Sequence, residues 1–155
     1  MIGLLAATAA VFGVDQYLKK KVDETCSEGE EKPILKEKAV ITKHYNQGFA
    51  ASVMKDDPKA VTKIHAVVAA IFLFCYTLIV RDKGNPVRKV GCALVLGGGL
   101  SNLYDRLRKG HVVDYIRLPF LKLKKLAGMV FNLADVCIVI GSILILLGRD
   151  RKNLW

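Results

Sequence analysis

The chain has 155 residues, of which 52% are hydrophobic and 25% are charged, and these averages alone would also fit an ordinary soluble protein. The apolar residues, however, are concentrated in four blocks, and the polar stretches between the blocks hold most of the charge. The formal net charge of +10 does not indicate a nucleic-acid partner, because Lys and Arg fall at the block ends, as expected of side chains at lipid headgroups.

The four apolar blocks predict a mainly α-helical integral membrane protein that forms one domain over residues 1–155. They lack the polar stripe at 3.6-residue spacing that marks a soluble amphipathic helix. Each is close to the length of about 20 residues that crosses a bilayer. Transmembrane helices are therefore predicted at about 2–18, 64–81, 90–105 and 126–147.

The first block has a second interpretation as a secretory signal, since small residues fill positions 6–10. The basic segment that normally precedes such a signal is missing, which favours a retained span. Four spans put both termini on one side of the membrane and the loop 19–63 on the other. Most Lys and Arg lie in this loop and in 105–125, so a positive-inside count would place both loops in the cytoplasm. Acidic residues in the first loop offset that count, and charge alone leaves the orientation open.

The loop 19–63 contains segments of different character. Residues 25–38 are charged and nearly free of apolar side chains, which predicts a mobile excursion. The β-branched and aromatic residues of 39–45 predict a short strand, and Asn46-Gln47-Gly48 follows with turn chemistry. Residues 49–54 are apolar enough to lie at the membrane interface.

Small and charged residues near the block ends predict local contacts. Gly97 to Gly99 are expected to let helices pack closely in lipid, and no strand precedes them to make a dinucleotide site. Asp15 is expected to pair with Lys19 one turn later, at the interface. Asn102, Asp105 and Arg106 share a helical face, which predicts an Asp105–Arg106 ion pair supported by Asn102.

Asp114 and Asp135 stand apart because neither has a cation four residues on, where Leu118 and Val139 stand. Asp135, one turn after Asn132, opens the longest apolar run, where a carboxylate costs roughly 2.5 to 3.5 kcal/mol to insert. Two nearby carboxylates in a low-dielectric site share one proton. One can then activate water as a general base while its protonated partner polarises a carbonyl, which predicts amide hydrolysis without a covalent intermediate.

Other catalytic chemistries have weaker support. Ser52, Ser101 and Ser142 have no base close in sequence. The three histidines and four cysteines form neither a metal-binding spacing nor a disulfide framework, so no metal and no cofactor is expected.

The same residues resemble the lipoprotein signal peptidase, or signal peptidase II, family. The resemblance rests on four stretches that follow in order along nearly the whole chain: Asp15-Gln-Tyr-Leu-Lys19, Asn46-Gln-Gly-Phe-Ala-Ala-Ser52, the run from Gly97 to Ile116, and Phe131-Asn-Leu-Ala-Asp135.

The resemblance implies a four-span aspartyl endopeptidase of the bacterial cell membrane that cuts diacylglyceryl-modified prolipoproteins before the lipidated cysteine. It implies cytoplasmic termini, an active site near the outer face, and a small extracytoplasmic β-sheet with an amphipathic loop over the site. Asp114 and Asp135 match the catalytic dyad. Substrate-binding or site-supporting residues would be Asn46, Gly48, Asn102, Arg106 and Asn132, and structural residues Asp15, Lys19 and Asp105. We expect a monomer that contacts membrane lipids and is inhibited by globomycin-type cyclic peptides.

The chain departs from the family pattern at a few positions, and two other functions stay open. Ser101 replaces the usual glycine before the motif asparagine, Phe49 comes early, and Ala51 takes the usual aromatic place. The first alternative function is a small proton-coupled transporter, in which the acids form a relay. The second is an inactive family member that binds lipidated peptides without cutting them.

Overall fold

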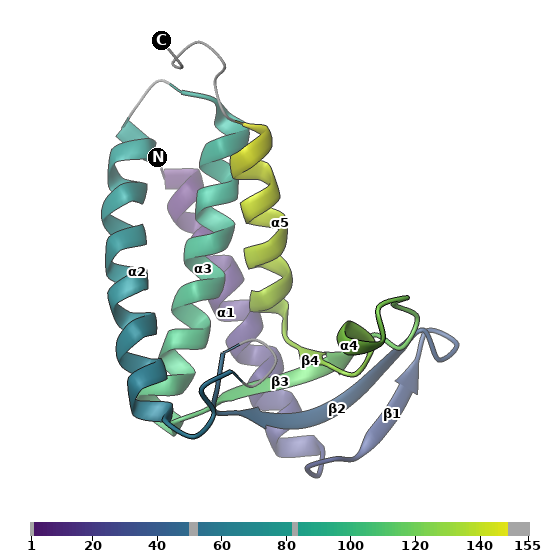
Figure 1. Cartoon of the computed structure of the whole chain (residues 1–155). Coiled ribbons are helices and arrows are strands. Elements are labelled where there is room, and N and C mark those ends of the chain that lie inside the picture. Colours follow the sequence, from purple (N-terminus) through teal and green to yellow (C-terminus); the bar gives the residue numbers. More distant parts are fainter. Residues whose placement is uncertain (1, 50–52, 82–83, 149–155) are drawn as a thin grey trace.

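Four helices stand side by side in the computed structural model, and a small sheet lies across one end of them (Figure 1). The helices are α1 (Ile2–Thr25), α2 (Pro58–Arg81), α3 (Pro86–Lys109) and α5 (Leu133–Leu147). The strands are β1 (Glu31–Ile34), β2 (Ala39–Asn46), β3 (Val112–Arg117) and β4 (Val130–Phe131), with a short helix α4 (Lys124–Ala127) before β4. The structure describes residues 2–49, 53–81 and 84–148. The start of α1 and the end of α5 both lie at the end of the bundle away from the sheet (Figure 1).

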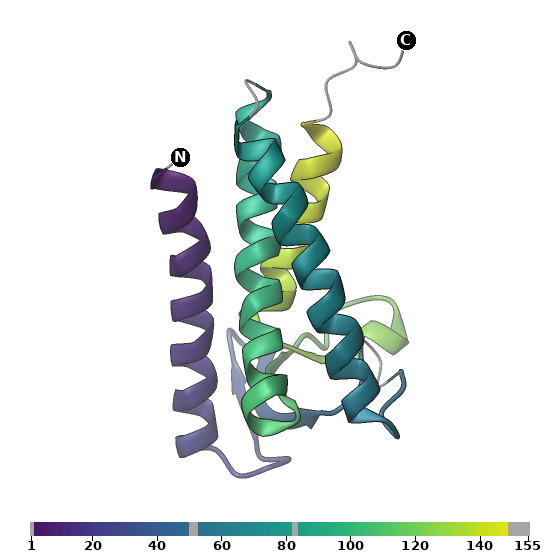
Figure 2. The ribbon, with the colours of Figure 1, turned by 90° about the vertical axis from the view of Figure 1, so that its left-hand side faces the viewer.

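Helix α3 is the centre of the bundle and contacts α1, α2 and α5; Figure 2 shows it between α1 and α2. A Cβ atom added at Gly98 would lie 2.5 Å from the Ala134 carbonyl oxygen of α5, and one at Gly97 would lie 2.7 Å from the Thr8 carbonyl oxygen of α1. The predicted close packing is therefore confirmed at these two glycines. It is wrong for Gly99, where an added Cβ would meet nothing within 4 Å.

The helices differ in how they could meet a bilayer. Among the described residues, α2 alone is both long and apolar enough to cross a membrane, and α5 is apolar but has 15 residues. Most of the large apolar side chains of α2 are exposed: Ile64, Val67, Val68, Ile71, Leu73, Phe74 and Leu78. Helices α1 and α3 have 24 residues each and carry charged side chains that the bundle buries.

Helix α5 begins later than the predicted span 126–147, because Asn132 ends the preceding strand and caps the helix. The Asn132 Oδ1 atom accepts a hydrogen bond from the Asp135 backbone N–H at 2.9 Å, and the Asp135 carboxylate accepts one from the Asn132 N–H at 3.1 Å. This reciprocal pair is a capping box, which satisfies two N–H groups that a helix start leaves free. The residues before it form α4 and β4 instead of a continuous helix.

The sheet is antiparallel throughout, in the order β1-β2-β3-β4. The predicted strand 39–45 is confirmed as β2. The predicted mobile excursion at 25–38 is wrong, because β1 lies within it and pairs with β2, with Glu31 opposite Thr42. Strand β3 pairs with β2 so that Asp114 lies opposite His44, and Asp114 thereby projects from the centre of the sheet.

Candidate active site

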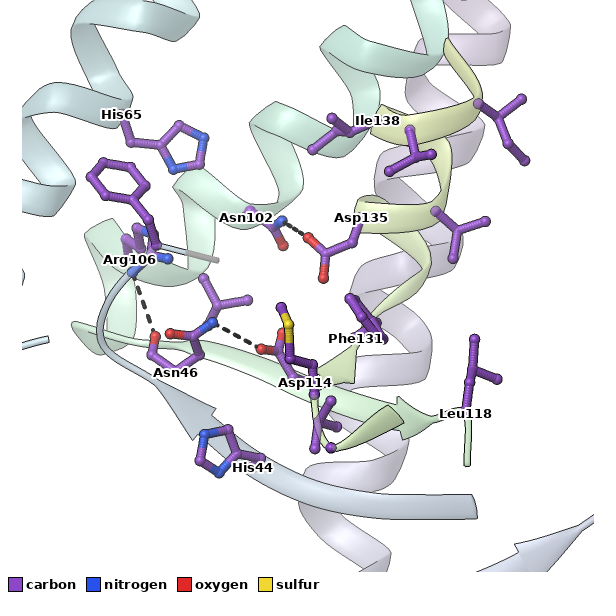
Figure 3. A pocket seen from close by; sticks show the side chains of 18 of the residues that line it. His44, Asn46, His65, Asn102, Arg106, Asp114, Leu118, Phe131, Asp135 and Ile138 are labelled. Carbon is purple, nitrogen blue, oxygen red and sulfur yellow. Dashed lines mark hydrogen bonds between the residues drawn. The ribbon is translucent and has the colours of Figure 1, made fainter. Parts of the chain in front are cut away.

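Asp114 and Asp135 come from different elements and meet in one cavity. Asp114 lies in the middle of β3, and Asp135 lies in the first turn of α5. Both line a cavity of about 1010 Å³, and Figure 3 shows both carboxylates pointing into it. The two acids that the sequence singled out are thus brought together by the sheet and the helix that follows it.

Two asparagine side chains connect these acids. Asn132 Nδ2 donates to Asp114 Oδ1 at 2.7 Å and to Asn102 Oδ1 at 3.1 Å. Asn102 Nδ2 in turn donates to Asp135 Oδ1 at 2.9 Å (Figure 3). Each carboxylate therefore has amide donors that fix its orientation.

Asp114 is only 2% exposed, and its second oxygen accepts a hydrogen bond from Asn46 Nδ2 at 3.0 Å. Burial, and after it the negative charge of Asp135, raise the pKa of Asp114 to about 7. Both effects penalise the ionised form. Near neutral pH, Asp114 is therefore able to hold a proton.

The cavity is bounded by the sheet at one end and by helices along its sides. Val68 of α2 and Val136 and Val139 of α5 form part of an apolar wall, while Asn102 and Arg106 of α3 add polar groups. Exposed apolar side chains on α2 and α5 continue outward from this wall. The arrangement places an apolar wall beside the two acids.

Arg106 holds the chain that follows β2. Its guanidinium donates to the Gly48 carbonyl oxygen at 2.5 Å and to the carbonyl oxygens of Asn46 and Gln47 at 3.4 Å. The Phe49 ring centroid lies 6.0 Å from Arg106 Cζ, and Phe49 also lines the cavity. Arg106 therefore fixes the backbone beside Asp114, at the position where Asn46 reaches the acid. The motif positions Ala51 and Ser52 lie outside the described residues.

The predicted Asp105–Arg106 ion pair is wrong. Asp105 pairs with Lys19 at 3.1 Å and with Lys109 at 3.7 Å, because its side chain faces α1 while Arg106 faces the loop after β2. The predicted Asp15–Lys19 pair is confirmed at 2.8 Å, but it is fully buried between α1 and α3 and does not lie at an interface with lipid.

Two neighbours of this ion cluster were missed in the sequence. Ser101 is fully buried, and its hydroxyl donates to Asp15 Oδ2 at 2.6 Å. Gln16 Nε2 donates to Ser101 Oγ at 2.9 Å and to Asp105 Oδ1 at 3.3 Å. The signal available was Ser101 itself, a hydroxyl in place of the family glycine and directly before Asn102.

The histidines do not gather. His44 and His65 line the cavity from β2 and α2, whereas the His111 ring packs on Tyr45 with centroids 4.3 Å apart. Within residues 2–49, 53–81 and 84–148, no group of three or more His, Cys, Asp or Glu side chains is placed to hold a metal ion.

The chain is similar to known proteins in sequence and in fold. A sequence model of the family described as "Signal peptidase (SPase) II" matches residues 7–149. The chain is 33% identical over 135 residues to a lipoprotein signal peptidase of Moorella thermoacetica, covering 87% of this chain and 84% of that one. It is 31% identical over 149 residues to that of Lactiplantibacillus plantarum, covering 96% and 95%.

The fold is also similar to that of a solved protein described as "Bacterial membrane enzyme structure by the in meso method at 2.3 A resolution". The TM-score is 0.83 at 24% identity, over 95% of this chain and 87% of that chain. The chain therefore shares the fold of that protein over nearly its whole length. The chain belongs to the signal peptidase II family.

Proposed function

We propose that this protein is an aspartyl endopeptidase of the bacterial cell membrane that removes the signal peptide from diacylglyceryl-modified prolipoproteins, cutting before the lipidated cysteine. Membership in the signal peptidase II family supports the removal of signal peptides from prolipoproteins. The aspartyl mechanism is supported by one observation above all. Asp114 and Asp135 point into the same cavity and are linked through Asn132 and Asn102.

The proposed reaction uses one proton shared by the dyad. Asp135 accepts a proton from a water molecule as the water oxygen attacks the scissile carbonyl carbon. Protonated Asp114 donates a hydrogen bond to the carbonyl oxygen and stabilises the negative charge that forms there. The tetrahedral intermediate then collapses: the C–N bond breaks, and the leaving nitrogen takes a proton from the dyad. No covalent intermediate between enzyme and substrate forms.

The remaining polar residues support this reaction. Asn46 and Asn132 hold Asp114 through their side-chain amides, and Asn102 holds Asp135. Arg106 and Gly48 fix the backbone of the loop after β2, where the substrate peptide would lie along the cavity. Globomycin-type cyclic peptides are expected to inhibit by occupying the same cavity.

The proposed arrangement in the membrane has four crossings, α1, α2, α3 and α5, with both termini cytoplasmic and the sheet at the outer face. The exposed apolar sides of α2 and α5 would contact lipid. A diacylglyceryl-modified substrate would enter sideways between them, with its acyl chains still in the bilayer. We propose that the monomer is active.

The alternatives predict different outcomes. A proton-coupled transporter would give pH-driven flux in proteoliposomes without peptide cleavage, and membership in a peptidase family does not favour it. An inactive lipopeptide-binding homologue would bind a lipidated precursor and leave it intact. The presence of both acids in the cavity favours an enzyme over this second alternative.

The function is tested with the purified protein and a prolipoprotein precursor supplied with and without its diacylglyceryl group. We expect cleavage of the lipidated precursor alone, and mass spectrometry should find the modified cysteine at the new N-terminus. Binding without a product would indicate the inactive homologue. Equal cleavage of both precursors would contradict the proposed lipid requirement.

A further inference from the structure

Lys19 is a charged side chain with no exposure to solvent. Its ammonium lies 2.8 Å from Asp15 and 3.1 Å from Asp105, and the three side chains are all fully buried. None of the three lines the cavity. A buried charged group is costly unless it is paired, and the two carboxylates pair with this ammonium.

The same ammonium also contacts the catalytic network. Lys19 Nζ donates to Asn102 Oδ1 at 2.7 Å, the shortest of its contacts. An ammonium has three donors and no acceptor, so it can face only the oxygen end of the Asn102 amide. The nitrogen end is thereby turned toward Asp135, where Nδ2 donates to Oδ1 at 2.9 Å.

The opposite orientation of Asn102 is excluded by charge. If the amide rotated by half a turn, its N–H groups would face the Lys19 ammonium, and its oxygen would face the Asp135 carboxylate. Both contacts would be repulsive, and the donor from Asn132 would lose its acceptor on Asn102. Asn132 alone would not be enough to impose the observed orientation on the Asn102 amide, because Asn132 can bond Asp114 whichever way Asn102 points.

We infer that Lys19 is a positioning residue of the dyad: its ammonium fixes which end of the Asn102 amide faces Asp135, and thereby orients the Asp135 carboxylate. This inference rests on the proposed peptidase function and deepens it. The Asn132 backbone N–H donates to Asp135 Oδ2 at 3.1 Å, and Asn102 donates to Oδ1. Each oxygen of this carboxylate therefore accepts a hydrogen bond. The start of α5 adds a favourable field for a negative charge.

The test replaces Lys19 by a residue of similar length that both donates and accepts. In Lys19→Gln the side chain no longer dictates the Asn102 orientation. We expect kcat for the lipidated precursor to fall at least about tenfold, with KM within about twofold, because a base that is held less well slows the chemical step. Lys109→Gln is the matched control. Lys109 also pairs with Asp105, whereas the hydrogen bond to Asn102 comes from Lys19. The control should retain the kcat of the original protein.

A double-mutant cycle separates positioning from a general structural role. In an Asn102→Ala background, adding Lys19→Gln should lower kcat no further, because Lys19 acts through the removed amide. If Lys19→Gln does not fold, the double variant Lys19→Gln/Asp105→Asn is used, because it keeps the net charge of the buried cluster. Its kcat is compared with that of Asp105→Asn, and the double variant should show the same drop.

Three results would overturn the inference: an unchanged kcat, a change confined to KM, or an equal loss in the Asn102→Ala background. Cleavage by the original protein is measured first. If the original protein does not cleave the precursor, the proposed function is rejected. If it cleaves normally, the Lys19 variants test the positioning role separately.

Discussion

Asn132 donates a hydrogen bond to Asp114 at 2.7 Å with the same side chain that caps the helix carrying Asp135. The Asn132 oxygen is used by the Asp135 backbone N–H, so the nitrogen end must face Asp114. One asparagine therefore caps the start of α5 and holds the Asp114 carboxylate. The geometry of the dyad is thus coupled to a local capping box.

Replacing Asn132 should separate stability from activity. Asn132→Ala removes the cap, which costs about 1 kcal/mol of stability, and also removes the donor to Asp114. We expect cleavage to fall by roughly 100-fold or more, since a displaced catalytic group slows the reaction by that order. Thermal unfolding and the initial cleavage rate are measured together.

Asn85→Ala is the control for this variant. Asn85 caps α3 through a bond from the Val87 N–H at 2.9 Å and does not line the cavity. It should show a comparable loss of stability and retain cleavage. Cleavage by Asn132→Ala at the original rate would disprove the coupling between the cap and the dyad.

The pH dependence follows from the raised pKa of Asp114, about 7. Protonated Asp114 is needed to polarise the carbonyl, so kcat/KM should decline as pH rises through about 7. The free energy of unfolding should also decrease as pH rises. A carboxyl with a higher pKa in the folded than in the unfolded protein stabilises the fold at low pH, and this contribution is lost as pH rises from the ordinary pKa of 3.8 to about 7.

These two trends are measured as a rate profile and as melting temperatures across pH 5 to 9, a range chosen around the pKa of about 7. In Asp114→Asn the corresponding part of the stability change should disappear. A cleavage rate that stays constant well above neutral pH would contradict the assignment of the proton to Asp114.

Close packing between α3 and α5 is tested at two adjacent glycines. A Cβ at Gly98 would lie 2.5 Å from the Ala134 carbonyl oxygen, next to Asp135, so Gly98→Ala should push the helices apart. We expect a loss of about 1 to 3 kcal/mol of stability and lower cleavage. Gly99→Ala is the control, because nothing lies within 4 Å of an added Cβ. It should be neutral or stabilising, since alanine favours a helix. Equal effects of the two variants would contradict the packing argument.

The proposed topology is tested with reporter fusions. Alkaline phosphatase, which is active only outside the cytoplasm, should be active when fused after Asp57, before α2, and inactive when fused after Asn85, before α3. The opposite pattern would agree with the plain count of Lys and Arg and would reject the proposed orientation.

Local sequence patterns predicted the contacts made within one element. The spacing of Asp15 and Lys19 gave their ion pair, and the composition of 39–45 gave strand β2. Sequence patterns failed where the partner is distant in the chain. Strand β1 has the composition of a mobile loop and is a strand because β2 pairs with it, and Asp105 is bound by Lys19 of another helix instead of by adjacent Arg106.

Asp114 and Asp135 could be singled out from the sequence because acids beside an apolar run are costly, and the structure places both in one cavity. The connection between them could not, since it depends on side-chain amides from α3 and from the residue before α5. The burial of Lys19 was hidden for the same reason: the sequence does not specify which side of α1 packs on α3.

Cleavage of a diacylglyceryl-modified precursor by Asp114→Asn and Asp135→Asn, followed by gel shift, tests the central claim most directly. Each variant keeps the size of the side chain and removes its ability to share the proton, so both should be inserted in the membrane and release no signal peptide. Asp56→Asn, at an exposed acid outside the cavity, should cleave as the original protein does. Normal cleavage by either dyad variant would contradict an aspartyl mechanism at this site.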